Sequence, residues 1–500
     1  MTDSYRAERL EKLTKLRELG VDPFGWRYPD VESVASVRAR AEKLGVAPEK
    51  IFDDETTRVA GRVMLQRVFG SLIFLTIRDA TGDIQLGLSK KAIGPDFKAA
   101  KLLDLGDIVG VSGRIGATKT GELTVWADDF TFLCKSLQPP PAKWHGFVDV
   151  DLRYRRRYVD LFANPPVRKV FQARSLIIEA IRRVLYERGF MEVETPVLQP
   201  QYGGAAARPF TTHHNTLDLE LFLRISPELY LKRLLVGGLE RVFEISRNFR
   251  NEGISTKHNP EFTMLELYQA YADYNDMMEI TEAMVTAAIE RLGGGSKRTF
   301  GGVELDFTPP WPRHKYFDLL KEYAGVEARD PAALRSKADQ LGIDHAGKDD
   351  AVVINDVFEH TVEKHLIQPC FVHDYPAAIC PLTRRDPNDD QIALRFEAFA
   401  AGMELGNAYT ELNDPLMQEE NFQRQLAGED ETMAVRDDDF LLALEYGMPP
   451  AGGLGVGIDR LVMVLTDSTS IRDVILFPLQ RPAAGSTQAP IANPEEAASP

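Results

Sequence analysis

Residues 241–274 read RVFEISRNFRNEGISTKHNPEFTMLELYQAYADY and predict the central strand pair of the fold. The first strand runs from Val242 to Arg250 and the second from Glu261 to Tyr268, with a polar loop between them. Because side chains alternate along a strand, one face collects residues suited to a core, namely Phe243, Ile245, Phe249, Thr263, Leu265 and Leu267. The other face gathers a guanidinium, aromatic rings and carboxylates that a core would not hold unpaired. This polar face is suited to a nucleotide and a small cationic molecule held together.

The composition is that of a soluble globular protein with two or three domains, because 500 residues carry 44% hydrophobic and 27% charged side chains. No apolar run reaches transmembrane length, and the N-terminus MTDSYRAERLEKL lacks the apolar core of a signal peptide. We therefore expect a cytoplasmic protein with no membrane association. Cys134, Cys370 and Cys380 are too few and too scattered for a disulfide framework, so free thiols are expected.

The net charge of −16, with a pI near 5.2, limits how this chain could bind nucleic acid. It argues against a binder held mainly by bulk charge. It does not exclude RNA, because a local basic surface on an acidic protein is sufficient for binding.

The sequence pattern predicts an α+β protein made of successive segments. In order they are an N-terminal helical extension (1–56), an all-β domain (57–138), a linker and hinge (139–169), a domain with a large antiparallel sheet flanked by helices (170–482) and a disordered tail (483–500). A mostly helical insertion without a recognisable chemical motif is expected within the large domain, at residues 275–365.

The all-β domain shows five short strands with Gly or Asp between them, at 59–69, 71–79, 83–89, 107–117 and 122–134. Five such strands suit a five-stranded Greek-key barrel, the OB-fold, which often binds single-stranded nucleic acid. Periodicity alone leaves any small barrel or sandwich possible.

Two stretches before the strand pair are polar enough to take part in chemistry. The loop 203–217 is rich in glycine and contains His213 and His214, whose direct adjacency is poor geometry for a metal site. The helix that begins in SPELYLKRLLVGG can be capped by Ser226. Glu228 in its first turn could be no more than a partner for the helix dipole.

The stretch RFEAFAAGMELGNAYTELNDP carries carboxylates seven residues apart, at Glu397, Glu404 and Glu411. Its glycines and its β-rich context oppose a helix, so we expect a hairpin that turns near residues 401–402. That turn brings Glu397 and Glu404 close together. Two carboxylates beside triphosphate oxygens are a typical hard-oxygen site for Mg²⁺.

The second strand of this hairpin presents two faces with different chemistry. Asn407, Tyr409 and Glu411 share one parity, and Glu404 has the other. A bulge near Gly406 is therefore needed if both faces are to reach one pocket.

The stretch AGGLGVGIDRLVMVL, residues 451–465, has glycines at alternate positions up to Gly457. These let the backbone approach a flat ring closely. A helix is expected to begin near Ile458, which places Arg460 at a helix N-terminus, a good anion site. A GxGxG pattern is weak evidence by itself.

The sequence segments FRNEG, HNPEFT and ELY resemble the second signature motif of class II aminoacyl-tRNA synthetases, in the form found in bacterial lysyl-tRNA synthetases. The helix expected at 174–188 ends at Gly189, and the following Glu194-Thr195-Pro196 resembles motif 1. GLGVGIDRLVM followed by IRDVILFP resembles motif 3. The resemblance covers roughly residues 5–482. It implies an OB-fold anticodon-binding domain, a class II catalytic domain and a homodimer formed through the catalytic domain.

The resemblance also implies a role for individual residues. For ATP these are Arg250 on the α-phosphate, Glu252 and Phe262 on adenine, His258 near the terminal phosphates, Gly457, and Arg460 on the γ-phosphate, the two arginines being catalytic. For the amino acid they are Gly204, Glu228 on the α-ammonium, Glu266, Tyr268, Asn407, Tyr409 and Glu411. Glu397 and Glu404 are implied to hold Mg²⁺, and Phe74, Gln85 and Glu122 to contact the anticodon. By its residue type alone, Phe74 could equally belong to the barrel core.

The activity implied is the activation of L-lysine with ATP and its transfer to the 3′ end of tRNA(Lys). Carboxylates in the pocket suit an ammonium group, whereas an aspartate pocket would need a cation. Three rival interpretations are an ordinary amphipathic hairpin, a ligase of the same fold that modifies a translation factor and lacks the barrel, and a synthetase-like protein that only binds RNA.

Overall fold

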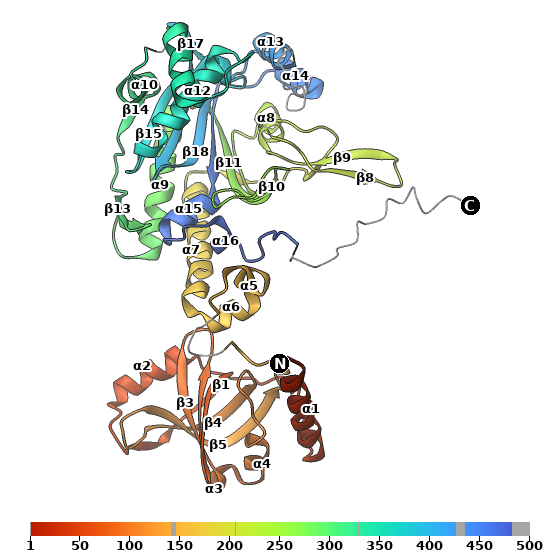
Figure 1. Cartoon of the computed structure of the whole chain (residues 1–500), viewed down its shortest axis with the longest axis vertical. Coiled ribbons are helices and arrows are strands. Elements are labelled where there is room, and N and C mark those ends of the chain that lie inside the picture. The colour runs from red at the N-terminus through yellow and green to blue at the C-terminus, as the bar shows by residue number, and fades with distance from the viewer. Residues whose placement is uncertain (1, 142–146, 206, 328–329, 427–435, 483–500) are drawn as a thin grey trace, which may run out of the picture. The chain divides into compact units, whose positions relative to one another are not determined.

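The computed structural model describes residues 2–141, 147–205, 207–327, 330–426 and 436–482 (Figure 1). The chain divides into two compact units, Met1–Phe147 and Val148–Pro500. The predicted disordered tail (483–500) and residues 142–146 of the predicted linker lie outside the described residues. Among the helices that are described, none combines the length and the apolar character needed to cross a membrane.

The first unit is a closed β-barrel, which confirms the predicted barrel and excludes a sandwich. Its strands are β1 (Ile51–Phe69), β2 (Leu72–Arg78), β3 (Asp83–Ser89), β4 (Ile108–Ala117) and β5 (Leu123–Cys134). They close in the order β1-β2-β3-β5-β4, and β3 runs parallel to β5. The helices of this unit are α1 (Thr2–Glu18), α2 (Val34–Leu44), α3 (Lys90–Ile93) and α4 (Phe97–Ala100).

Alternation along β2 separates the barrel core from the outer face of the barrel. Ile73, Leu75 and Ile77 are fully buried in the barrel core. Phe74 is half-buried and lies outside that core cluster. Phe74 therefore belongs to the outer face, where its ring is able to meet a ligand.

The second unit is built on one large sheet flanked by helices. The strands of this sheet are β6 (Met191–Glu192), β10 (Arg241–Phe249), β11 (Glu261–Ala270), β14 (Arg313–Lys315), β15 (Cys370–Pro376), β16 (Arg385–Asp386), β17 (Asp389–Ala400), β18 (Met403–Thr410) and β19 (Ala451–Gly457). Their order is β14-β15-β17-β18-β19-β11-β10-β6, and β16 pairs with β17. The centre is antiparallel as predicted, but β6 is parallel to β10 and β14 to β15, so the sheet is mixed at its edges.

The helices of the second unit lie on this sheet and around its ends. They are α5 (Val150–Arg155), α6 (Arg157–Ala163), α7 (Pro165–Glu187), α8 (Glu228–Val236), α9 (Tyr274–Leu292), α10 (Tyr316–Ala324), α11 (Pro331–Leu341), α12 (Asp350–Thr361), α13 (Pro415–Leu426), α14 (Asp438–Glu445), α15 (Ile458–Leu465) and α16 (Ile471–Val474). Helices α7 and α9 pack against each other and share the main hydrophobic core with the sheet.

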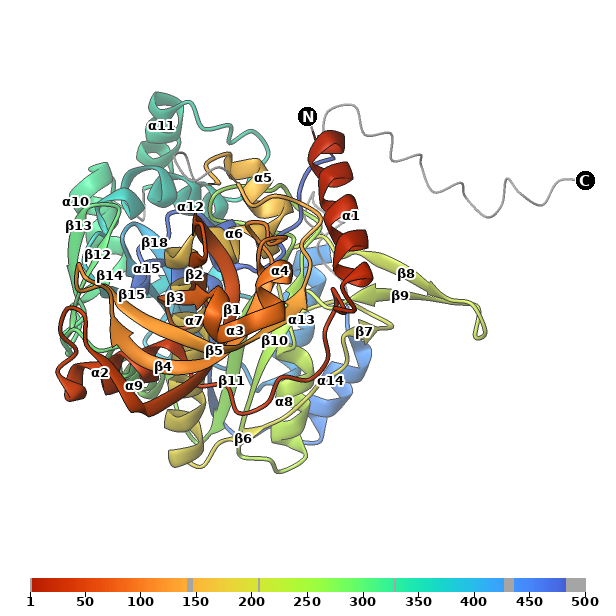
Figure 2. The same cartoon turned by 90° about the horizontal axis from the view of Figure 1, so that it is seen from below.

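Two small sheets complete the second unit. They are formed by β12 (Lys297–Phe300) with β13 (Val303–Asp306), and by β7 (Leu198–Gln199), β9 (Leu219–Leu223) and β8 (Thr211–His214). The β8–β9 ribbon stands away from the large sheet in both views (Figures 1 and 2). Part of the loop predicted at 203–217 is therefore a strand.

Strands β10 and β11 confirm the predicted strand pair and the faces on which its residues lie. Glu266 on β11 lies opposite Glu244 on β10 and opposite Gly455 on β19. The predicted core face is buried, with Phe243, Leu265 and Leu267 fully enclosed. The pairing with β19 brings the glycine-rich stretch directly beside the polar face of β11.

Strands β17 and β18 confirm the predicted hairpin and its bulge. The chain turns at residues 401–402, where φ is 54° and 64°. The register shifts between Gly406 and Glu404, which leaves Leu405 without a cross-strand partner. This extra residue is the bulge that places Glu404 and Asn407 beside the same cavity.

Candidate active site

Two adjoining cavities open beside the polar face of β11. The first has a volume of about 330 Å³ and Glu228 and Glu266 in its wall, and we name it the acidic pocket. The second has a volume of about 210 Å³ and is lined by Arg460, and we name it the arginine cavity. Both are lined by Arg250, Met264, Asn407 and Gly455, so the two cavities meet along these residues.

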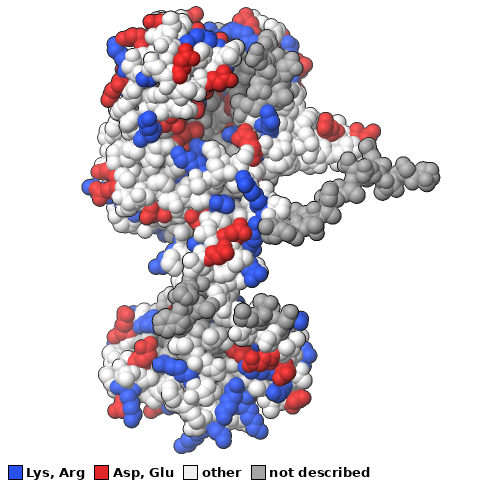
Figure 3. Space-filling view, viewed as in Figure 1, with Lys and Arg blue, Asp and Glu red and all other residues white. Residues whose placement is uncertain are grey.

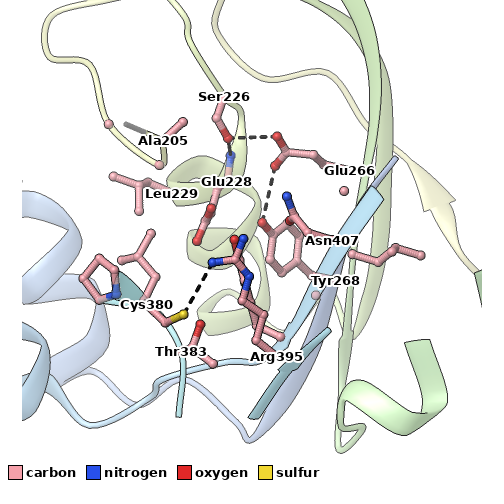
Figure 4. Close-up of a pocket in the computed structure, with 18 of the residues that line it drawn as sticks. Ala205, Ser226, Glu228, Leu229, Glu266, Tyr268, Cys380, Thr383, Arg395 and Asn407 are labelled. Atoms are coloured by element: carbon pink, nitrogen blue, oxygen red, sulfur yellow. Dashed lines mark hydrogen bonds between the residues drawn. The ribbon is translucent and has the colours of Figure 1, made fainter. Parts of the chain in front are cut away.

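All but one of the residues predicted to bind lysine line the acidic pocket. They are Gly204, Glu228, Glu266, Tyr268, Asn407 and Tyr409. Figure 4 shows the side chains of Glu228, Glu266, Tyr268 and Asn407 around the cavity, on α8, β11 and β18. Gly204 has a φ of 84°, and a Cβ there would lie 3.0 Å from the Cβ of Glu228, so glycine allows the loop to approach α8 closely.

Glu266 is the most enclosed carboxylate that lines the acidic pocket, with 4% of its surface exposed. Ser226 Oγ donates a hydrogen bond to its Oε1 at 2.8 Å, and the Tyr268 hydroxyl donates to its Oε2 at 3.3 Å (Figure 4). Burial, with a smaller contribution from Glu228, raises the pKa of Glu266 to about 8. The sequence predicted Ser226 as a helix cap, and its hydroxyl does accept from the Glu228 amide at 3.1 Å.

Glu411, the remaining predicted lysine-binding residue, lies behind the wall of the acidic pocket. Its side chain is fully buried, and its Oε2 lies 2.5 Å from the ammonium of Lys232 on α8. Lys232 Nζ also donates to Glu228 Oε1 at 2.7 Å. Burial alone would lower the pKa of Lys232, but Glu228 and Glu411 outweigh it and raise that pKa. Burial raises the pKa of Glu411 to about 8, although Lys232 opposes the shift.

Arg395 lines the acidic pocket although it was not among the predicted site residues. Figure 4 shows its guanidinium pointing into the cavity, with Nη1 3.4 Å from Cys380 Sγ. Its Nη2 donates to Glu397 Oε1, and its guanidinium carbon lies 4.7 Å from the centre of the Tyr375 ring. The signal that could have found it is parity, because Arg395 and Glu397 are two residues apart on one strand face.

The arginine cavity collects every residue that was predicted to bind ATP. These are Arg250, Glu252, His258, Phe262, Gly457 and Arg460. The Arg250 guanidinium carbon lies 5.1 Å from the centre of the Phe262 ring. Among the described residues, Arg250 has no carboxylate partner, and its Nε is buried without a hydrogen bond. Burial lowers the pKa of Arg250 from its ordinary value.

Arg460 contacts two other predicted residues at the far side of the arginine cavity. It stands in the first turn of α15, and its Nη1 lies 3.1 Å from Glu404 Oε2. Its Nη2 lies 3.0 Å from His258 Nε2. Burial and the neighbouring Arg460 charge lower the pKa of His258, so the imidazole is neutral and free to accept a hydrogen bond.

Glu397 and Glu404 lie close enough together for their charges to interact. Arg460 and Arg395 outweigh the effect of burial and lower the pKa of Glu404, whereas burial raises the pKa of Glu397 to about 7. In the described ranges, no group of three or more His, Cys, Asp or Glu side chains is arranged to hold a metal ion. These two carboxylates therefore fit Mg²⁺ only if a bound molecule supplies further oxygen ligands.

The barrel has its own cavity, which brings together the three residues predicted to contact an anticodon. Phe74, Gln85 and Glu122 line a space of about 810 Å³ that is also bounded by Phe69, Arg67 and Trp126. Gln85 is buried, and both ends of its amide are hydrogen-bonded. Its oxygen accepts from Arg67 at 2.7 Å and its nitrogen donates to Thr124 at 2.9 Å. The Phe74 ring meets those of Phe69 and Trp126 edge-on.

Comparison with known families agrees with this architecture. A family model described as tRNA synthetases class II (D, K and N) matches residues 149–481, and one described as an OB-fold nucleic acid binding domain matches residues 57–133. The fold and the site are thus those of a class II tRNA synthetase with an attached OB-fold domain.

Relatives narrow the assignment within that class. A lysine–tRNA ligase from Carboxydothermus hydrogenoformans is 51% identical over 482 residues, covering 95% of this chain and 97% of that protein. One from Moorella thermoacetica is 52% identical over 484 residues, with the same coverage. The chain belongs to the lysine–tRNA ligase family, which confirms the resemblance seen in the motifs.

Proposed function

We propose that the protein activates L-lysine with ATP and transfers it to the 3′ end of tRNA(Lys). The observation that carries this proposal is the position of Arg250. Its Nε is buried where the acidic pocket meets the arginine cavity, and no described carboxylate forms an ion pair with its guanidinium. A buried arginine cannot lose its charge, so such a site needs an anion from a ligand. The α-phosphate of ATP, approached by a substrate carboxylate, supplies that anion.

In the first step, a carboxylate oxygen of lysine attacks the α-phosphorus of ATP. A phosphorus–oxygen bond to pyrophosphate breaks, and the products are lysyl-adenylate and pyrophosphate. The carboxylate is already ionised, so the step needs no general base. Arg250 stabilises charge on the α-phosphate, and Arg460 on the γ-phosphate. Phe262 and Glu252 hold the adenine. The resulting alignment of the reacting groups lowers the activation barrier of this step further.

We further propose that Glu397 and Glu404 hold Mg²⁺ together with the triphosphate. When bound, the ion neutralises phosphate charge. In the empty site, Arg395 and Arg460 pair with these two carboxylates. Arg460 must therefore exchange its contact with Glu404 for one with the γ-phosphate when the nucleotide enters. His258, which contacts Arg460, accompanies that movement near the terminal phosphates.

Specificity for lysine follows from the charges of the acidic pocket. Glu228 takes the α-ammonium, and Glu266 and Glu411 with Tyr268 and Asn407 favour an ammonium at the end of the side chain. Of the two arginines that line the pocket in the described part of the chain, Arg395 is already paired with Glu397, and Arg250 stands at the junction with the arginine cavity. An acidic side chain would thus be repelled by these carboxylates, and a neutral one would offer them no cation.

In the second step, the 3′-hydroxyl of the terminal tRNA ribose attacks the carbonyl carbon of lysyl-adenylate, and AMP leaves. The barrel is assigned to the anticodon, with Phe74 as a stacking platform and with Gln85 and Glu122 at base edges. Lys and Arg side chains gather at the end of this unit over α3 and α4 (Figure 3). The exposed lysines there are Lys90, Lys91, Lys98 and Lys101, a local basic surface for phosphates on an acidic protein.

We also assign the protein to the cytoplasm, as a homodimer joined through the region of α7 and β6. Large apolar side chains are exposed there, namely Tyr186, Met191, Val197 and Leu198. A second copy of the chain would cover them, as expected for a contiguous apolar patch. Sedimentation velocity measures the mass, and a monomer at micromolar concentration would refute the dimer.

The test of the activity is amino-acid-dependent ATP–pyrophosphate exchange, measured with each of the twenty amino acids. Lysine is expected to support exchange, and the other amino acids are expected not to support it. Exchange with a different amino acid would refute the substrate, and no exchange with any would favour the RNA-binding alternative. Aminoacylation of tRNA(Lys) then tests the second step.

A further inference from the structure

Lys232 is a charged residue of the catalytic unit that has no role in the reaction steps described above. It lies on α8 one turn after Glu228, and its side chain is completely buried. Its ammonium lies 2.7 Å from Glu228 Oε1 and 2.5 Å from Glu411 Oε2. Burying an ammonium is costly unless carboxylates pair with it, so these two contacts fix the position of Lys232 and of both partners.

The two partners of Lys232 lie at different depths relative to the acidic pocket. Glu228 lines the acidic pocket, and Figure 4 shows its carboxylate pointing into the cavity. Glu411 Oε1 has no hydrogen-bond partner among the described residues. It packs against Gly453, where a Cβ would come within 2.0 Å of that oxygen, and Gly453 lines the pocket. A glycine at 453 therefore leaves the Glu411 carboxylate close behind the pocket wall.

The charges around the pocket can be counted once the internal pairs are removed. Arg395 pairs with Glu397, and Arg250 stands at the junction with the arginine cavity. The groups left for an amino acid are the carboxylates of Glu228, Glu266 and Glu411, together with the ammonium of Lys232. When ionised, this set has a charge of about −2, because one cation offsets one of three anions.

We infer that Lys232 is a positioning residue for lysine selection: it orients Glu228 and Glu411 and leaves a pocket charge that matches a ligand with two ammonium groups. The inference rests on the proposed function, because it assumes that the ligand is lysine. It differs from the assignment of the carboxylates themselves, since Lys232 touches no substrate atom. It acts through Glu228, which lines the acidic pocket, and through Glu411, which lies behind the pocket wall.

The electrostatics of Glu411 give the direction of the effect. Burial raises its pKa to about 8, and Lys232 opposes that rise. The other groups that face it are Glu228 on α8, Glu266 and Tyr268 on β11, and Tyr409 on β18. Without Lys232, Glu411 would keep its proton to a higher pH and attract a substrate ammonium less strongly at neutral pH.

The barrel contains a matched control for a purely structural role. Lys135 is also completely buried and also lies between two carboxylates, at 2.6 Å from Asp104 and 2.9 Å from Asp107. None of these three residues lines the cavity of the barrel. Loss of Lys135 should therefore cost stability, as loss of Lys232 should, without any reason to change the affinity for lysine.

The experiment compares the wild type with Lys232→Met and Lys135→Met in lysine-dependent ATP–pyrophosphate exchange from pH 6.5 to 9. Lys232→Met is expected to raise the KM for lysine about twentyfold at pH 7 while the KM for ATP changes less than about twofold. The rise should shrink as the pH increases. Lys135→Met is expected to keep both KM values at a comparable loss of melting temperature.

Three outcomes would overturn the inference. They are an unchanged KM for lysine in folded Lys232→Met, an equal rise in Lys135→Met, and a lower KM for lysine, which would mean that Lys232 competes with the substrate. If Lys232→Met gives no folded protein, Lys232→Gln replaces it, since the amide keeps both donors without the charge. A wild-type KM in that variant also overturns the inference. Failure of the wild type to use lysine at all would instead refute the proposed function.

Discussion

The acidic pocket and the arginine cavity share a wall but satisfy their buried charges in opposite ways. In the acidic pocket, each predicted carboxylate has an internal partner: Ser226 and Tyr268 for Glu266, and Lys232 for Glu228 and Glu411. In the arginine cavity, the central guanidinium of Arg250 has none among the described residues. A carboxyl group can escape the cost of burial by taking a proton, whereas an arginine cannot give one up.

The difference predicts that the two cavities respond to different perturbations. The acidic pocket contains groups with pKa values near 8, so its charge depends on pH in the neutral range. The arginine cavity keeps its central positive charge at every accessible pH. Binding of the amino acid should therefore be sensitive to protons and internal ion pairs, and binding of the nucleotide to the loss of one guanidinium.

The largest effect is expected from Arg250→Gln. Removing the one donor that faces the transferred phosphorus should lower kcat for lysine-dependent exchange about a thousandfold. The control is Arg247→Gln on the same strand, because Arg247 is exposed and has only a 3.7 Å contact with Glu261. Pre-steady-state and exchange kinetics measure kcat for both variants. Equal losses in the two would show that Arg250 acts through the strand rather than through the phosphate.

The next largest effect is expected on the KM for lysine, and it distinguishes the acidic pocket from the arginine cavity. Glu411→Gln removes the carboxylate that pairs with Lys232 behind the pocket wall, so the KM for lysine should rise about fiftyfold. The KM for ATP should stay within about twofold, since no atom of Glu411 reaches the arginine cavity. Glu404→Gln is the reciprocal variant and should raise the KM for ATP instead. The contrast between the cavities fails if either variant changes both constants alike.

Most of this site could be predicted from the sequence, because its residues lie on elements whose alternation is visible. The parity of β11 placed Phe262, Glu266 and Tyr268 on one face, and the misfit of Glu404 with Asn407 required the bulge that is found at Leu405. These inferences need only local geometry. The glycine-rich strand and the helix that begins at Ile458 follow from local signals in the same way.

What the sequence could not supply depends on contacts between distant elements. Lys232 looks like an ordinary helix residue one turn after Glu228 until β18 brings Glu411 against it. Glu411 shares its parity with two residues of the pocket wall, yet a pairing partner and Gly453 place it behind that wall. For Phe74 the pattern allowed either face of β2 as the core, and only closure of the barrel decides between them.

A smaller effect is expected in the barrel, which has no part in the exchange reaction. Phe74→Ala removes a half-buried ring from a cavity shared with Phe69 and Trp126, and should raise the KM for tRNA about tenfold. Lysine-dependent exchange without tRNA should be unchanged. Phe24→Ala is the control, since Phe24 is 46% exposed in the same unit and does not line that cavity. A loss of exchange in Phe74→Ala would contradict the separation of the two tasks.

The smallest effect is the pH dependence of lysine binding, and its direction follows from Glu266. In the empty pocket, burial raises its pKa to about 8, so the carboxyl group holds a proton at pH 7. An ammonium binds the ionised form, so binding releases a proton and the affinity should rise about fivefold between pH 7 and pH 8. Calorimetry in two buffers of different ionisation enthalpy measures the released proton directly. ATP binding should show no such release from this group.

The same shift has a consequence for stability, and its sign is opposite to that for binding. The ordinary pKa of a glutamate is 4.5, below the value in the folded protein, so the folded state binds more protons between these values. The unfolding free energy of the empty protein should therefore fall as the pH rises from about 4.5 to about 8. Lysine should offset this fall, and its effect on melting temperature should grow with pH. Glu266→Gln should reduce both slopes without abolishing them, because Glu411 and Glu397 also have raised pKa values, whereas Glu261→Gln, at an exposed position of the same strand, should leave both slopes unchanged. Slopes as steep in Glu266→Gln as in the wild type would instead assign the titration to the other buried carboxyl groups with raised pKa values, Glu411 and Glu397.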